Sequence, residues 1–128
     1  GAYSESNANG SRAGAAYVFD LAGTRLFKLL PSNTRADQFF GRAVVVTDEL
    51  IFVSAPETTS SGTGGEVYIY DLSGSLLKRL TAPDRALGDF FGIGMAVRGD
   101  TLLVGAAYND DKGSESGSIY TFNIRDLV

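Results

Sequence analysis

A polar stretch near the end of the chain holds the residues best suited to bind a metal ion. Asn109, Asp110, Asp111 and Glu115 carry the hard oxygen atoms that Ca²⁺ prefers as ligands. Asn and Asp also form turns without any ligand, because their side chains hydrogen-bond to nearby backbone groups. The sequence therefore supports two hypotheses for this loop, a calcium site and a plain solvated turn, and it favours the turn.

The tripeptide Arg98-Gly99-Asp100 has the composition of an adhesion signal that animal cells read. A corresponding turn earlier in the chain, Thr47-Asp48-Glu49, has the same length but not the tripeptide. Gly-Asp also suits a tight hairpin turn for backbone reasons alone. We expect a turn here, and the sequence leaves open whether any receptor reads it.

Asn9 begins an Asn-Gly-Ser sequence, which is an acceptor for N-glycosylation in a secreted protein. The surrounding residues predict an exposed loop. Asn9 is therefore a candidate glycosylation site if the source organism glycosylates, and otherwise part of an ordinary loop.

Carboxylate pairs for glycoside hydrolysis occur in the sequence without a supporting motif. Asp84 with Asp89, and Asp110 with Glu115, are possible pairs. Such chemistry depends on a defined separation of the two carboxyl groups, which a sequence does not give. Both pairs fall in segments that vary along the chain, so we predict no catalytic residues and no cofactor beyond the calcium hypothesis.

Four tyrosines could stack on sugar rings, as aromatic residues do in carbohydrate-binding proteins. They are Tyr17, Tyr68, Tyr70 and Tyr120. Each lies in a short segment that alternates aromatic and aliphatic residues, so packing in a core is the first interpretation.

Composition excludes several classes of function. The 128 residues include no Cys, His or Trp, which rules out disulfides, thiolate nucleophiles and Cys/His zinc sites. A Ser-His-Asp triad is impossible without an imidazole. The net charge is −4 with no basic stripe, so nucleic acids and anionic membranes are poor candidate partners. No apolar run is long enough to cross a bilayer, and we expect any secretion signal to have been removed or to lie outside this chain.

The elements that carry these residues follow an internal repeat. The segment DQFFGRAVVVTDELIFVSAP, residues 37–56, recurs as GDFFGIGMAVRGDTLLVGAA, residues 88–107. A second block that begins with Gly and contains alternating aromatics occurs three times, from Gly14, Gly65 and Gly117. Repeats of about this length indicate solenoids, propellers or arrays.

Each unit predicts four short strands. The first strand is expected at 42–46 and 93–97, buried on both faces, and the second at 50–55 and 101–106. The third is expected at 15–21, 66–72 and 118–124, and the fourth, a half-exposed edge strand, at 25–30 and 76–80. Four strands in a unit of about 50 residues predict an all-β fold of β-propeller blades, each with four antiparallel strands.

The repeated motifs resemble the FG-GAP repeat, also called the integrin-alpha-like propeller repeat, in its longer bacterial form. The matching residues are Phe40, Gly41, Ala55 and Pro56 in one unit and Phe91, Gly92, Gly105 and Ala106 in the next. The resemblance implies blades that form seven-bladed rings in integrins and some fungal lectins, and tandem arrays in secreted or surface-attached bacterial proteins. Independently of the name, glycines allow close backbone approach, and the phenylalanines fill space between blades.

The chain contains less than a full ring. We divide it into a partial blade at 1–38 with the last two strands, a complete blade at 39–89, and a partial blade at 90–128 with the first three strands. That is about two and a quarter blades, whereas propellers have roughly four to eight. Incomplete blades expose apolar faces, so we expect a protein partner or self-association.

The sequence thus predicts an extracellular or cell-surface module without catalysis, acting in protein–protein interaction, adhesion, or filament or matrix assembly. The alternative is a carbohydrate-binding, lectin-like propeller with a glycan ligand. We expect no nucleic-acid partner and no membrane insertion.

Overall fold

Strands dominate the computed structural model of the chain, which describes residues 1–31, 34, 36–56, 64–83, 90–107 and 117–127. The elements in chain order are β1 (Ala16–Phe19), β2 (Arg25–Leu29), β3 (Val44–Val46), β4 (Leu50–Ala55), β5 (Glu66–Asp71), β6 (Leu76–Leu80), β7 (Phe91–Arg98), β8 (Thr101–Ala106), β9 (Ser118–Asn123) and the short helix α1 (Ile124–Leu127). They form three antiparallel sheets in the orders β1-β2, β3-β4-β5-β6 and β7-β8-β9.

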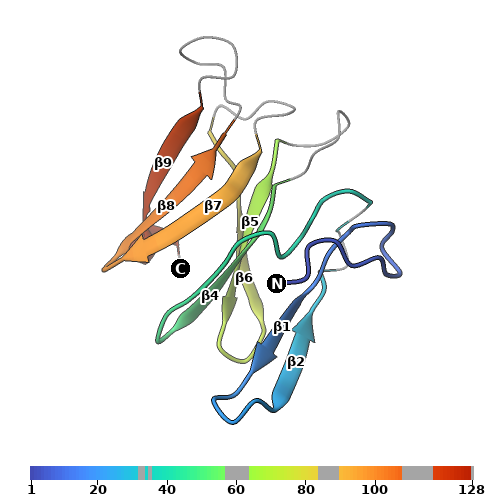
Figure 1. The fold of residues 1–128 in the computed structure, drawn as a ribbon. Helices are drawn as coiled ribbons and strands as arrows, with labels where there is room; N and C mark the ends of the chain where they lie inside the picture. Colours follow the sequence, from blue (N-terminus) through green and yellow to red (C-terminus); the bar gives the residue numbers. More distant parts are fainter. Residues whose placement is uncertain (32–33, 35, 57–63, 84–89, 108–116, 128) are drawn as a thin grey trace.

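The second sheet has four consecutive strands, and we name its strand positions A, B, C and D. By the repeat, β1 and β2 occupy positions C and D of the first sheet, and β7, β8 and β9 occupy positions A, B and C of the third. The three sheets fan out side by side, with the second between the other two (Figure 1). This arrangement confirms the predicted all-β fold of partial propeller blades without closure.

The two central strands of the second sheet are buried on both faces, because β4 and β5 send alternate side chains to opposite neighbours. We call the face of a sheet that lies toward the sheet of the next unit its C-side face, and the opposite face its N-side face. Phe52 and Ile69 point to the C-side face and pack with Leu102 of the third sheet. Val53 and Tyr68 point to the N-side face and pack with the first sheet. The continuous apolar runs of β4 and β5 are therefore explained by burial on both faces.

The turn between positions C and D is the same in the first two sheets. Asp20 Oδ1 accepts hydrogen bonds from two backbone N–H groups of its turn. Asp71 Oδ1 accepts from the Ser73 hydroxyl and from the N–H groups of Ser73 and Ser75, and these bonds hold the pKa of Asp71 below its usual range. The aspartate fixes the turn through its side chain.

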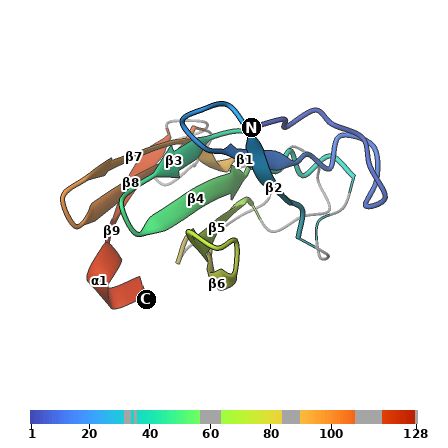
Figure 2. The ribbon, with the colours of Figure 1, turned by 90° about the horizontal axis from the view of Figure 1, so that it is seen from below.

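Several features differ from the predictions. Strand β7 is not buried on both faces, because Gly94 and Ala96 are exposed. Strand β3 is not buried on both faces, because Val44 and Val46 are 49% and 69% exposed where the first sheet has no A and B strands to cover them. The third C strand ends at Asn123 and not at residue 124. Asn123 Oδ1 accepts a hydrogen bond from Arg125 N, and the chain turns into α1 (Figure 2). Ile124 and Leu127 of α1 pack against the core.

Candidate functional site

The Phe-Phe-Gly segments join each unit to the preceding one in the same way. Phe40 N donates a hydrogen bond to Ala13 O at 3.0 Å, and Phe91 N donates to Gly64 O at 2.8 Å. The residue before each, Phe39 or Phe90, has a left-handed backbone with φ near 57° or 56°. Such a conformation is strained for a bulky residue, so its recurrence marks a position that the surrounding structure enforces.

Two glycines allow this close approach. Gly14 lies against the backbone of Phe40, and Gly65 against the backbone of Phe91. A Cβ at either glycine would overlap the carbonyl oxygen of that phenylalanine, and both glycines have positive φ values of 85° and 106°. The start of each C strand is therefore the contact point for the Phe-Gly segment of the next unit.

The same aromatic contact occurs in the second and third sheets. Phe40 meets Tyr68 edge-on, with ring centroids 5.1 Å apart, and Phe91 meets Tyr120 edge-on at 5.5 Å. Both phenylalanines are fully buried. Each sheet thus places a Phe from the start of its A strand over the aromatic residues of its own C strand.

A carboxylate, a tyrosine and a cation form a cluster beside the C strand of the second sheet. Tyr68 Oη donates to Glu66 Oε2 at 2.9 Å, and Arg79 Nη2 donates to Glu66 Oε1 at 2.7 Å. Glu66 is only 3% exposed, and the guanidinium also lies over the Tyr68 ring. The ion pair and both hydrogen bonds compensate for burying the carboxylate, and the pairing raises the pKa of Arg79.

The first sheet has an equivalent cluster built from a different sequence position. Tyr17 and Lys28 correspond to Tyr68 and Arg79, but the carboxylate is Glu5, from the loop before the C strand. Lys28 Nζ lies 2.5 Å from Glu5 Oε1, and Tyr17 donates to Glu5 Oε2. The hydrogen bond from Lys28, followed by that from Tyr17, lowers the pKa of Glu5, and the same contact raises the pKa of Lys28.

The C-side face of the third sheet is uncovered. Ile119 and Gly105 are cross-strand neighbours there, as are Thr121 and Leu103. Ile119 is 72% exposed, whereas Val67, at the same position in the second sheet, is fully buried. A shallow depression on this face is lined by Ile93, Gly105 and Ile119 together with Ala106, Ala107, Gly117 and Ser118.

The opposite end of the fan is also open. A groove of about 250 Å³ lies between β1 and β3. We call it the edge groove, and its lining includes Tyr17, Phe19, Val44, Val46 and Ile51. Phe19 is 56% exposed, and Val44 and Val46 are also exposed. The two ends of the array thus present apolar surface, and these open blade faces are the candidate functional site.

The predicted calcium ligands Asn109, Asp110, Asp111 and Glu115 lie outside the described residues. The pair Asp84 and Asp89 also lies outside them. Within the described part of the chain, no group of three acidic side chains is arranged to hold a metal ion. The calcium and carboxylate-pair hypotheses therefore remain sequence predictions.

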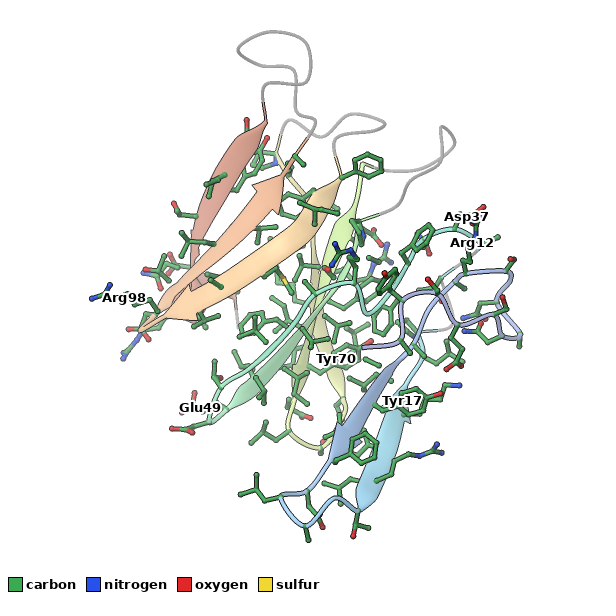
Figure 3. All side chains as sticks on the ribbon, in the orientation of Figure 1. Arg12, Tyr17, Asp37, Glu49, Tyr70 and Arg98 are labelled. Carbon is green, nitrogen blue, oxygen red and sulfur yellow. The ribbon has the colours of Figure 1, made fainter. Side chains whose placement is uncertain are left out.

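The tripeptide Arg98-Gly99-Asp100 forms the turn between β7 and β8, as expected. Gly99 has φ of 58°, and Arg98 points away from the sheet at the tip (Figure 3). Asp100 makes two contacts within the chain. Its backbone oxygen accepts a hydrogen bond from Ile124 N at 2.7 Å, and its carboxylate forms an ion pair with Arg125 Nε at 2.8 Å. The residue fastens α1 to the hairpin.

Asn9 is half-buried, and its side-chain nitrogen is engaged. Nδ2 donates to Pro31 O at 2.8 Å and to Thr34 Oγ1 at 2.7 Å. Glycosylation at this nitrogen would replace one of these two hydrogen bonds, which connect the N-terminal loop to the segment after β2.

The tyrosines of the C strands lie mainly in the core. Tyr68 is fully buried and Tyr70 is 4% exposed. The Tyr70 hydroxyl has no hydrogen-bond partner among the described residues, and burial raises its pKa well above the usual range. Tyr17 is half-buried, with Arg25 and Lys28 over its ring.

The remaining motif residues occupy the ends of the B strands and the start of the A strands. Ala55, Pro56 and Ala106 are buried. Gly41 lies against Ala15 O, and a Cβ on Gly92 would come within 2.8 Å of Ser54 Cβ. Gly105 stands where Ser54 stands in the second sheet, on the uncovered face.

Sequence reasoning missed the two carboxylates that pair with the repeated tyrosines and cations. The signal was partly present, since Tyr17 and Tyr68 recur and Lys28 and Arg79 keep a positive charge. The carboxylate does not recur at one position, so comparison of the repeats did not reveal it.

Comparison with known families supports the same architecture. Residues 75–122 match the family model described as FG-GAP repeat. No curated protein matches the chain. Within the described residues, no helix has the length and hydrophobicity needed to cross a membrane.

The matched segment runs from β6 to β9, so one sequence repeat contains a D strand followed by A, B and C strands of the next sheet. The repeat therefore includes the contact between two blades. The match confirms the resemblance carried by Phe91-Gly92 and Gly105-Ala106, and it indicates a structural, propeller-type interaction module. Residues 75–122 of this chain are therefore similar to an FG-GAP repeat.

Proposed function

We propose that this chain is a protein-interaction module of an extracellular or cell-surface protein, acting without catalysis in adhesion or in filament or matrix assembly. Its binding surfaces are the open blade faces. Val67 and Ile119 occupy the same position in the second and third sheets. Val67 is buried by the next sheet, whereas Ile119 is 72% exposed, and this contrast is the main support for the proposal.

The exposed face keeps the features with which the second sheet receives the third. Gly117 has φ of 82°, like Gly65, which contacts Phe91 of the next unit. Gly105 stands at the place of Ser54, which contacts Gly92 of the next unit. The C-side face of the third sheet therefore has the shape of a surface that accepts a further Phe-Gly segment.

Burial of such a face is favourable. A fully buried Ile or Leu side chain contributes roughly 1.5–3 kcal/mol, and Ile119 lines one depression together with Gly105 and Ile93. Contiguous exposed apolar surface of this kind marks an interaction site.

A second copy of the chain supplies a complementary surface. The C-side face of the second sheet packs on the N-side face of the third, so the C-side face of the third sheet suits an N-side face of another copy. The free N-side surface is the edge groove with Tyr17 and Phe19. Contact between different ends of identical chains is heterologous and extends into a ring or a filament.

Carbohydrate binding is the second candidate function of the chain. Burial of Tyr68 and Tyr70 leaves Tyr17 and Tyr120 as the tyrosines for sugar stacking, and cations already lie over the Tyr17 ring.

Binding of the soluble chain to immobilised chain on a biosensor tests the proposal. We expect concentration-dependent binding that Ile119→Lys in the soluble chain removes. Leu77→Lys, on β6 of the covered second sheet, is the matched control and should retain binding. Absence of binding by the wild-type chain, together with saturable binding on a glycan array, would overturn the proposal in favour of the carbohydrate alternative.

A further inference from the structure

A second groove lies between the first and second sheets, at the edge formed by their D strands. We call it the rim groove, and its volume of about 330 Å³ is at the lower end of the range for small-ligand sites. Its lining includes the apolar residues Leu29, Leu30, Pro31 and Leu76, together with Lys28 and Tyr70. The A and B positions lie at the opposite edge of a sheet, so the rim groove does not depend on the strands that the first sheet lacks.

The hydroxyl group of Tyr70 distinguishes this groove from the rest of the surface. Tyr70 is only 4% exposed, and its Oη has no hydrogen-bond partner among the described residues. Burial of a hydroxyl group without a hydrogen bond is unfavourable, because the group loses its contacts with water and gains none in return. The rim groove therefore has an unsatisfied polar group at its wall.

The fold requires the aromatic ring of Tyr70 but not its hydroxyl group. The equivalent residues of the other two units are Phe19 and Phe122. The Tyr70 ring meets Phe40 edge-on with centroids 6.5 Å apart, and Phe122 meets Phe91 edge-on at 6.1 Å. Because phenylalanine makes the same contact in the third sheet, packing between the units does not explain the hydroxyl group.

The polar atoms next to the Tyr70 hydroxyl already have partners. Among the lining residues, all of which the structure describes, Lys28 Nζ is the only other side-chain polar atom, and it pairs with Glu5 Oε1 at 2.5 Å. Pro31 O accepts hydrogen bonds from Asn9 Nδ2 and from the backbone N–H of Thr34. The side chains of the groove thus offer one unpaired hydroxyl group and no unpaired charge.

These properties define the class of ligand that the groove suits. Burial raises the pKa of Tyr70, so the hydroxyl group stays protonated at neutral pH and can donate a hydrogen bond. The apolar wall favours an apolar ligand body, and the absence of an unpaired cation among the lining side chains disfavours a carboxylate or a phosphate. A buried water molecule typically needs two to four polar partners, which these side chains do not supply.

We propose that the rim groove binds a small uncharged organic ligand, whose apolar body packs on Leu30, Pro31 and Leu76 and whose acceptor oxygen receives a hydrogen bond from Tyr70. The hydroxyl oxygen is itself covered, so the ligand reaches it when Leu76 moves aside. Leu76 is the cross-strand partner of Tyr70 and is 45% exposed, which leaves its side chain room to change rotamer. This binding site goes beyond the proposed function, because it is separate from the open blade faces.

Cyclohexanone is the probe, since it combines an apolar ring with one acceptor oxygen. The isotope-labelled full chain is titrated with cyclohexanone and followed by NMR, and we expect saturable shifts at Leu29, Leu30 and Leu76. Tyr70→Phe should weaken binding about fivefold to tenfold, because it removes only the hydrogen bond. Its urea midpoint should be unchanged or higher, because the hydroxyl group has no partner in the free chain. Cyclohexylammonium, which has the same ring but no acceptor, should not bind.

Two neighbouring residues of β6 provide a matched pair of variants. Leu76→Asp places a charge on the apolar wall and should remove binding, whereas Leu77→Asp, at a residue with 47% exposure, should retain it. Ile119→Lys, on the open face of the third sheet, should bind cyclohexanone as the wild-type chain does.

Three results would overturn the proposal. The first is equal affinity of the wild-type chain and Tyr70→Phe for cyclohexanone, and the second is a set of shifts that grow without saturation. The third is a lower urea midpoint in Tyr70→Phe, which would mean that the hydroxyl group already has a partner such as a bound water molecule. None of these results bears on chain-to-chain binding, so the proposed function and the rim-groove proposal fail separately.

Discussion

At the scale of single residues, the repeated glycines are explained by contact between units. Gly65 lies against the Phe91 backbone and has positive φ, whereas Gly94 in β7 has open space around it and an ordinary φ. Two glycines of one sequence therefore have different roles, and only the first is required by the fold.

Replacement of Gly65 by Ala should destabilise the chain by about 2–4 kcal/mol, because a Cβ overlaps backbone and the φ is unfavourable. Gly94→Ala is the control and should be neutral or slightly stabilising. Urea denaturation measures both. Equal effects of the two substitutions would contradict the assignment of Gly65 as the contact point.

The Glu5 cluster makes stability depend on pH. Lys28 and Tyr17 lower the pKa of Glu5 below its ordinary value of 4.5, so its contribution to stability is present above that value and is lost as the pH falls through the lower, folded-state pKa. Glu5→Gln should therefore lower stability at neutral pH and flatten its decline in acid. Denaturant midpoints across the acid range check this, with Glu49→Gln at the β3–β4 turn as the control; an unchanged slope in Glu5→Gln would count against the cluster.

At the scale of elements, the blade contact depends on phenylalanines at the start of the A strands. Phe91→Ala should cost about 3–5 kcal/mol, since it leaves a cavity between the second and third sheets. Phe19→Ala should change stability by less than about 0.5 kcal/mol, because that side chain is 56% exposed. Thermal unfolding compares them, and a large loss for Phe19→Ala would show that the edge groove is closed within one chain.

The turn at Arg98-Gly99-Asp100 anchors α1. Asp100→Ala should remove the exposed ion pair to Arg125 and raise amide exchange across Ile124–Leu127, with a stability change under about 1 kcal/mol. Arg98→Ala, whose side chain points away from the sheet, should leave that exchange unchanged. The opposite ranking would mean that Asp100 does not hold the helix.

Strand positions were predictable because they depend on the local alternation of side-chain types, and this pattern occurs two or three times along the chain. The exposure of Val44 and Val46 was not, since burial of an A strand depends on a neighbouring sheet that the strand's own sequence does not describe. Helix α1 depends on a side-chain bond of Asn123 and on packing beneath two sheets, and the Glu5 cluster depends on a loop that folds back on β1.

At the scale of the whole molecule, the three sheets form a segment of a propeller-type array with two unlike ends. One end presents the C-side face with Ile119 and Gly105, and the other presents the edge groove with Phe19. Because the ends differ, the self-association proposed above would join one end to the other and would not be limited to a dimer.

The most direct test is the molar mass of the chain in solution, measured by light scattering over a series of concentrations. The proposed function predicts a mass above 13.5 kDa that rises with concentration, and a return to 13.5 kDa in Ile119→Lys. A wild-type mass of 13.5 kDa at every concentration up to the limit of solubility would contradict self-association through the open blade faces.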